Sequence, residues 1–196
     1  MAFDLYLASQ SPRRQELLNQ IGVHFAVKVA DIDETPLAAE SAEEHVKRLA
    51  FEKANTIAQS LSDDERRPVL GADTIVVIDG QILGKPTDRQ AAIEMLTSLS
   101  GKTHQVMTAV VLISEKHSVC VNVSEVSFRP LDPAEIESYW DSGEPRDKAG
   151  AYAIQGMAAS FISELKGSYS GVMGLPLYET SELLAKHKVP VWQNKT

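Results

Sequence analysis

The chain of 196 residues contains a single cysteine, Cys120, and its net charge is −8. One cysteine permits no disulfide and no cysteine-based zinc site within the chain, so we expect a buried structural thiol in a cytoplasmic protein. The negative charge argues against binding to nucleic-acid polymers, whose affinity depends mostly on neutralising phosphates. No apolar run approaches the ~20 residues that cross a bilayer, and no basic segment followed by an apolar one precedes the first strand. We therefore expect neither a membrane span nor secretion.

Several common catalytic motifs are also missing. The five histidines show no metal-ligand spacing, so we interpret each of them as structural. Gly101-Lys102-Thr103 resembles the end of a phosphate-binding P-loop, but Leu96 stands where that motif requires glycine. Neither a Gly-x-Gly-x-x-Gly fingerprint, nor a His-Glu-x-x-His pair, nor a Gly-x-Ser-x-Gly elbow occurs.

The hydrophobic pattern predicts alternating strands and helices with hairpins. Ser41 and Glu44 have the spacing of a capping box that opens a long helix, and Asp79-Gly80 is typical of a tight hairpin turn. We expect strands at 5–7, 23–29, 69–78, 81–83, 103–113 and 118–128, helices at 11–21, 41–60, 87–99, from 132 and at 176–188, and strands and loops in the glycine-rich region 143–174. The fold class is therefore α/β, with one mixed sheet covered by helices.

The first turn of the first helix is a candidate anion site. Ser11 can cap the helix, Pro12 suits its first position, and Arg13 and Arg14 follow at once. Free backbone N–H groups, the helix dipole and guanidinium groups all favour a phosphate there. The alternative is a capped surface helix with two solvated arginines. Cations in a first turn oppose the dipole, which favours the anion site.

An aspartate interrupts the apolar run from Val69 to Ile78. Asp73 lies in the segment Gly71-Ala72-Asp73-Thr74 and must meet a cation, a metal or hydrogen-bond donors if it is buried. It could be a magnesium ligand or a general base, or it could simply bond nearby backbone amides at a strand bend. Glu34 could supply a second carboxylate, although a solvated acidic loop would also explain it.

Three further features are weak when taken singly. Lys53 lies near the apolar face of the long helix, where it either snorkels or directs a charge inward. Lys85 stands beside Pro86 on a rigid loop, and the run from Asp147 to Gly156 combines flexible turns with polar groups able to contact a ligand.

Together these segments resemble the Maf family of nucleotide pyrophosphatases over essentially the whole chain. The matching residues, in chain order, are Ser9-x-Ser11-Pro12-Arg13-Arg14, Glu34, Lys53-Ala54, Gly71-Ala72-Asp73-Thr74, Gly84-Lys85-Pro86, Ser100-Gly101-x-Thr103-His104-x-Val106, Asp147 to Gly156, Gly167-Ser168-Tyr169 and Gly174-Leu175-Pro176. The resemblance implies an elongated, inosine triphosphate pyrophosphatase-like fold (Maf/Ham1) with two lobes around a cleft, and a single Maf-type domain over residues 1–196.

The same resemblance implies cleavage of a nucleoside triphosphate between the α and β phosphates, with a divalent metal (Mg²⁺ or Mn²⁺) as cofactor and a homodimer as the assembly. Asp73 would act as proton acceptor, metal ligand or both, and Glu34 would be a second metal ligand. Lys53 and Lys85 would complete the catalytic set. Substrate-binding roles fall on Ser9, Ser11, Arg13, Arg14, Thr74 and Gln155.

The combination of Arg13, Thr74 and Gln155 resembles the branch of the family that acts on dTTP and UTP. A glutamine amide offers one donor and one acceptor, which matches the O4 and N3–H edge of uracil or thymine. Two alternatives stay open. The first is the same hydrolysis directed at another base, such as a modified pyrimidine or a non-standard purine, and the second is a nucleotide-binding regulator of cell division or septum formation.

Overall fold

The computed structural model describes residues 3–193. Within them, seven strands form one mixed sheet in the order β2-β1-β3-β5-β6-β7, and β4 pairs with β3. The strands are β1 (Leu5–Leu7), β2 (Phe25–Val27), β3 (Val69–Ile78), β4 (Gln81–Leu83), β5 (Thr103–Ile113), β6 (His117–Phe128) and β7 (Ile162–Lys166). β1 is parallel to β2 and β3, whereas β3–β4 and β6–β7 are antiparallel. The predicted mixed α/β sheet is confirmed.

Six α-helices accompany the described strands: α1 (Pro12–Gln20), α2 (Ala42–Ser60), α3 (Arg89–Leu99), α4 (Pro133–Asp141), α5 (Tyr169–Met173) and α6 (Leu177–Lys186). The capping box is present, since the Glu44 N–H donates to the Ser41 hydroxyl and the Ser41 N–H donates to the Glu44 carboxylate. The prediction for the glycine-rich region was incomplete. It holds one strand, β7, together with α5 and the short 3₁₀ turns Glu144–Asp147, Ala149–Ala151 and Met157–Phe161.

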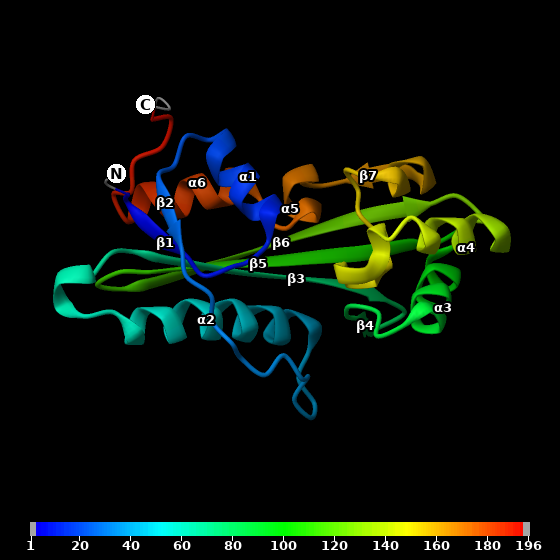
Figure 1. Cartoon of the computed structure of the whole chain (residues 1–196), viewed down its shortest axis with the longest axis horizontal. Helices are drawn as coiled ribbons and strands as arrows, with labels where there is room; N and C mark the ends of the chain where they lie inside the picture. Colours follow the sequence, from blue (N-terminus) through cyan, green and yellow to red (C-terminus); the bar gives the residue numbers. More distant parts are fainter. Residues whose placement is uncertain (1–2, 194–196) are drawn as a thin grey trace. The chain divides into compact units, whose positions relative to one another are not determined.

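The chain divides into two compact units. The first comprises the chain up to Asp73, residues 108–122 and the chain from Gly174 onward. In it, α1 and α6 lie on one side of the strands and α2 lies along the other (Figure 1). Its helices direct Leu17, Leu18 and Leu49 into the core, and the three side chains are at most 3% exposed.

The second unit comprises residues 74–107 and 123–173. Here α3 and α4 pack side by side (Figure 1). The core of this unit is rich in aromatic rings: Phe128 packs edge to face against Tyr152, and Tyr139 against Phe161. Cys120 lies in the first unit and is only half-buried, so the prediction of a buried thiol was wrong. None of the side chains at 117–123, in the first half of β6, is buried. Burial still raises the pKa of the Cys120 thiol to about 11.

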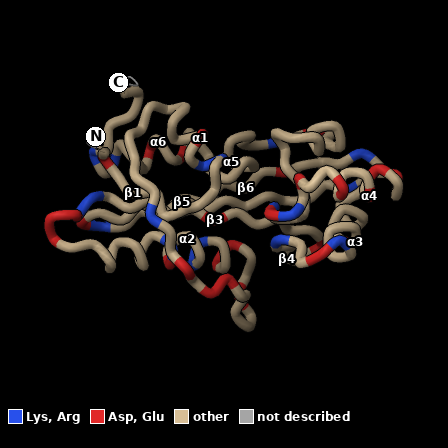
Figure 2. The backbone as a smooth tube through the Cα atoms, viewed as in Figure 1, with Lys and Arg blue, Asp and Glu red and all other residues tan. Residues whose placement is uncertain are grey.

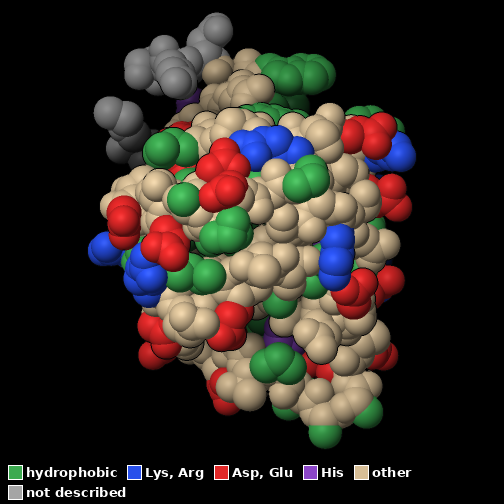
Figure 3. All heavy atoms as spheres, turned by 90° about the vertical axis from the view of Figure 1, so that its right-hand side faces the viewer, with side chains coloured by type: hydrophobic (Ala, Val, Ile, Leu, Met, Phe, Trp, Pro, Cys, Tyr) green, Lys and Arg blue, Asp and Glu red, His purple; other side chains and the backbone are tan. Residues whose placement is uncertain are grey.

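Charge is distributed unevenly along the first unit. Acidic stretches lie at both ends of α2, in the loop before it and in the turn Asp63–Glu65 after it (Figure 2). On the face drawn in Figure 3, acidic and basic side chains are interspersed.

None of the helices in residues 3–193 is long and apolar enough to cross a membrane.

Candidate active site

The first turn of α1 holds a buried guanidinium. Arg14 is 9% exposed, its Nε donates to the carbonyl of Gly174 at 2.8 Å, and its Nη1 donates to the Ser9 hydroxyl at 3.1 Å. The same hydroxyl accepts the N–H of Ser11 at 3.2 Å. Ser11 is the N-cap residue by backbone conformation, but its side chain makes no capping hydrogen bond. The arrangement fixes one arginine inward at the positive end of a helix, as an anion site requires.

The charges around Arg14 act on one another. Burial lowers the pKa of the Arg14 guanidinium, the carboxylate of Asp73 raises it again, Arg13 lowers it, and Glu34 raises it. The two arginines and the two carboxylates predicted from sequence therefore share one electrostatic environment within the first unit. A buried arginine held near carboxylates keeps its charge available for a polyanionic ligand.

Lys53 joins the two carboxylates. Its Nζ lies 2.6 Å from Glu34 Oε1 and 2.7 Å from Asp73 Oδ1. The Lys53 and Asp73 side chains are 13% and 10% exposed, while Glu34 is 43% exposed. Of the two alternatives for Lys53, the one in which its charge points inward is confirmed. The alternative in which Asp73 meets only backbone amides is wrong, because its carboxylate pairs with an ammonium.

A glycine brings β3 and α2 close enough for this ion pair. A Cβ at Gly71 would lie 2.4 Å from the carbonyl oxygen of Ala50 and 2.9 Å from the Cβ of Ala54, so only glycine fits there. Side chains alternate along a strand, which places Asp73 on the face of β3 that carries Gly71. On the helix, positions i, i+3 and i+4 share a face, which places Lys53 beside Ala50 and Ala54.

A second ion-pair cluster anchors the loop that carries Glu34, and the sequence analysis missed it. Arg48 of α2 donates from Nε and Nη2 to the Glu40 carboxylate at 2.7 and 2.9 Å, and from Nη2 to the carbonyl of Thr35 at 3.1 Å. His45 Nδ1 lies 3.0 Å from the same carboxylate. Hydrogen bonds from Arg48 lower the pKa of Glu40 to about 2. Glu40 precedes the helix, so no helical spacing could have paired it with Arg48.

The remaining predicted residues belong to the second unit. Thr74 directly follows Asp73 in β3 and is half-buried, while Lys85 and Gln155 are exposed. The carbonyl of Gly84 accepts the N–H of Gly150 at 3.0 Å, so a backbone hydrogen bond joins the loop of Lys85 to the run 147–156. Their roles toward a ligand stay predictions.

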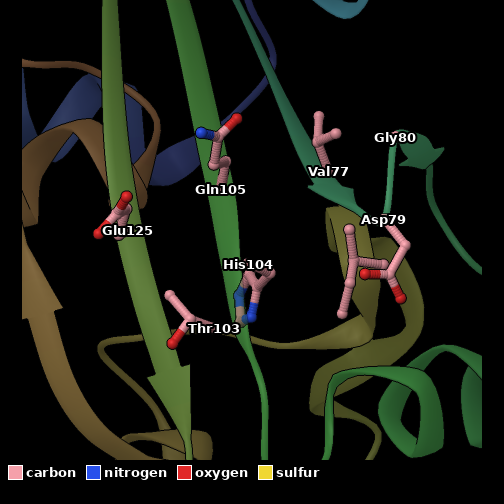
Figure 4. Close-up of a pocket in the computed structure, with 8 residues that line it drawn as sticks. Val77, Asp79, Gly80, Thr103, His104, Gln105 and Glu125 are labelled. Atoms are coloured by element: carbon pink, nitrogen blue, oxygen red, sulfur yellow. The ribbon is translucent and has the colours of Figure 1, made fainter.

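A pocket of about 280 Å³ in the second unit is lined by none of the residues predicted to bind substrate. Its lining includes Thr103, His104 and Gln105 of β5, Glu125 of β6, Val77 of β3, and Asp79 in the turn after β3 (Figure 4). His104 is 2% exposed, its Nε2 lies 2.8 Å from the Tyr152 hydroxyl, and burial lowers its pKa to about 4. The structural role that we predicted for this histidine stays a prediction.

The donor set for a metal is small. Among residues 3–193, no group of three or more histidine, cysteine or carboxylate side chains could hold an ion. Glu34 Oε1 and Asp73 Oδ1 both contact the Lys53 ammonium, at 2.6 and 2.7 Å. The distance between these two oxygens therefore cannot exceed the sum of the two ion-pair distances. Two carboxylates suit Mg²⁺, which commonly takes one or two protein carboxylates and completes its shell with substrate phosphates and water.

Comparison with known proteins places these residues in a described family. The family described as Maf-like protein matches residues 4–187. The chain is 53% identical to a dTTP/UTP pyrophosphatase of Alkalilimnicola ehrlichii, over 94% of this chain and 93% of the relative. It is 53% identical to the protein of the same name from Saccharophagus degradans, over 97% and 92% of the two chains. For the Pseudoalteromonas atlantica protein of that name, identity is 54% over 93% and 96%.

Among solved structures, the Ham1 protein of Staphylococcus aureus aligns with 64% of this chain and 71% of its own, at 14% identity and a TM-score of 0.43. That likeness is partial, so the family assignment depends on the sequence relatives.

Proposed function

Because the chain belongs to the Maf family, we propose that it hydrolyses dTTP and UTP to the nucleoside monophosphate and pyrophosphate. Relatives that are more than half identical over nearly the whole chain carry the name dTTP/UTP pyrophosphatase. One observation carries the proposal: Lys53 pairs with Asp73 and Glu34 in the unit that also buries Arg14 at the start of α1. A triphosphate needs such a concentration of cationic groups, and its hydrolysis needs carboxylates beside them.

We propose that Asp73 and Glu34 hold a divalent cation, Mg²⁺ or Mn²⁺, together with phosphate oxygens of the substrate. Such a cation, when bound, neutralises charge on the phosphates and polarises the phosphorus that is attacked. The fit lies in the chemistry of the two carboxylates and in their convergence on a single positive charge. Lys53 would then keep its ammonium beside Asp73, so that the two carboxylates stay together before the substrate arrives.

In the proposed reaction, a water molecule attacks the α-phosphorus. The bond from that phosphorus to the α–β bridging oxygen breaks, the electron pair leaves with pyrophosphate, and Asp73 accepts the proton of the water. Negative charge accumulates on the leaving group. Arg13, Arg14 and the N–H groups at the start of α1 would stabilise this charge, and the hydroxyls of Ser9 and Ser11 would add hydrogen bonds.

The residues of the second unit keep the roles that the sequence suggested. Lys85 would contact phosphate, and Thr74 and Gln155 would select the base. A glutamine amide turned to offer its N–H to O4 and its oxygen to N3–H fits both uracil and thymine. Cytosine presents the reverse pattern at these atoms, so a fixed amide would discriminate against CTP. A homodimer, a cytoplasmic location and the joint action of both units as one Maf-type domain complete the proposal.

The first test is pyrophosphate release from a panel of canonical and modified nucleoside triphosphates with Mg²⁺, for wild type and Asp73→Asn. Asp79→Asn is the matched control, because Asp79 lies beyond the end of the same strand and pairs with Lys102 at the surface. We expect rapid turnover of dTTP and UTP, lost in Asp73→Asn and kept in Asp79→Asn.

Other outcomes of the panel point elsewhere. Selective turnover of a different base would keep the reaction and refute the roles given to Thr74 and Gln155. Tight nucleotide binding without any turnover would refute the enzyme and favour the regulator of cell division.

A further inference from the structure

The segment that carries Gln155 is fixed by one carboxylate. Glu144 Oε2 accepts the N–H of Met157 at 3.0 Å, and Glu144 Oε1 accepts the N–H of Ala158 at 3.4 Å. These two amides lie immediately after Gln155 and Gly156. The Glu144 carboxylate thus bonds to the backbone on the C-terminal side of Gln155, 13 and 14 residues further along the chain.

The hydroxyl of Tyr139 fixes the other side of the segment. It donates to Glu144 Oε1 at 2.7 Å and accepts the N–H of Ala153 at 3.2 Å. Its ring packs edge to face on Phe161 and is 2% exposed. Burial and the bond to Glu144 raise the pKa of this hydroxyl, so it stays a donor to the carboxylate over the working range of pH. Gln155 is therefore bracketed by hydrogen bonds on both sides.

The contact between Glu144 and the segment leaves no space. A Cβ placed on Gly156 would lie 2.2 Å from Glu144 Oε2, so the carboxylate lies directly against the glycine backbone. The Gly156 N–H in turn donates to the carbonyl of Ala153 at 3.0 Å and closes a tight turn around Gln155. The backbone of Gln155 is thereby held in one conformation, whereas its side chain is exposed.

We infer that Glu144 and Tyr139 are positioning residues for base selection: they set the orientation in which the Gln155 amide meets the pyrimidine edge. The inference rests on the proposed function, in which Gln155 contacts the base. A glutamine amide fits uracil in one orientation and cytosine in the other, so discrimination depends on what fixes it. A rigid turn fixes the backbone of Gln155 and thereby limits the side-chain rotamers with which its amide can reach the base.

Glu144→Gln tests this with almost no change in volume. An NH₂ group would replace one of the two carboxylate oxygens and would face the N–H of Met157 or that of Ala158. Two donors cannot form a hydrogen bond with each other. Tyr139→Phe is the second variant; it keeps the ring on Phe161 and removes the hydroxyl that bonds Ala153. Glu137→Gln is the matched control on α4, since Glu137 is exposed and pairs with Arg89 at the surface.

The readout is the ratio of kcat/KM for UTP to that for CTP, measured within each variant. This ratio does not depend on the fraction of enzyme that is folded, so a loss of stability alone leaves it unchanged. We expect Glu144→Gln and Tyr139→Phe each to lower the ratio about tenfold, the size of one misplaced hydrogen bond. Glu137→Gln should keep the wild-type ratio. Combined with Gln155→Ala, Glu144→Gln should lower the ratio no further, because both changes remove the same discrimination.

An unchanged ratio in Glu144→Gln and Tyr139→Phe, with a lowered ratio in Gln155→Ala, overturns the inference and leaves the proposed function intact. An unchanged ratio in Gln155→Ala overturns both the inference and the role of Gln155 in base selection. Failure of the wild type to hydrolyse UTP in the panel above marks instead a failure of the proposed function.

Discussion

Replacing Lys53 by methionine should destabilise the protein in a way that Mg²⁺ partly reverses. The Lys53 ammonium lies 2.7 Å from Asp73 and 2.6 Å from Glu34. Methionine keeps an unbranched side chain next to Ala50 and Ala54, so little packing is lost. What remains is a pair of carboxylates without the positive charge between them.

The magnitude follows from the exposure of the three groups. Removing one partner of a fully buried ion pair costs about 3–5 kcal/mol. Asp73 is 10% exposed, but Glu34 is 43% exposed, so water screens part of the change. We therefore expect a loss of about 2–3 kcal/mol in the free energy of unfolding. For a protein of this size, each kcal/mol shifts Tm by about 2–4 °C.

A divalent cation can take the place of the missing ammonium. A cation at ten times its Kd stabilises the folded state by about 1.4 kcal/mol. We thus expect 10 mM Mg²⁺ to raise the Tm of Lys53→Met by several degrees, and to raise that of wild type less, because Lys53 already neutralises the pair. Differential scanning fluorimetry with and without Mg²⁺ measures both shifts, with Ca²⁺ as a test of ion preference.

Lys47→Met is the matched control. Lys47 lies on the same helix and pairs with Glu43 at the surface one turn away, an exposed contact worth about 0.3–0.5 kcal/mol. The reasoning is refuted if Lys53→Met is as stable as Lys47→Met, or if Mg²⁺ raises the Tm of both variants equally.

Two further predictions concern the elements that support the site. Because the pKa of Glu40 falls from 4.5 to about 2 on folding, the contribution of its pair with Arg48 is complete above pH 4.5 and is lost as the pH falls toward 2. The stability difference between wild type and Arg48→Gln, from urea unfolding, should be constant from pH 7 to 4.5 and shrink below; a difference that grows on acidification would contradict the pairing. Gly71→Ala should lose about 2 kcal/mol or more against the carbonyl of Ala50, whereas Gly84→Ala, with open space around it, should change stability by less than about 0.5 kcal/mol. Equal effects of the two glycine variants in the same assay would show that β3 can move away from α2.

The elements that the sequence predicted well are those specified by local chemistry. The capping box at Ser41 and Glu44 begins α2, and Pro12 begins α1, because the groups involved lie within one turn of each other. The Asp79-Gly80 turn joins β3 to β4, with both residues at positive φ. The glycine-rich region was harder, since its short 3₁₀ turns follow from hydrogen bonds made at a distance, such as those of Glu144.

The candidate site also has a part that follows from local sequence and a part that depends on distant contacts. The sequence by itself determined which residues are candidates for the site, because an aspartate in an apolar strand and two arginines in a first helical turn each need a partner of opposite charge. Only the tertiary structure decided which partners those are. Gly71 lets β3 approach α2, and Asp73 then pairs with Lys53 rather than with backbone amides. Glu40 with Arg48, and Glu144 with Tyr139, are eight and five residues apart but span different elements, so no helical or strand period could predict them. The sequence shows that a charged residue in an apolar segment requires a compensating group. Which group this is depends on how elements that are far apart along the chain pack together.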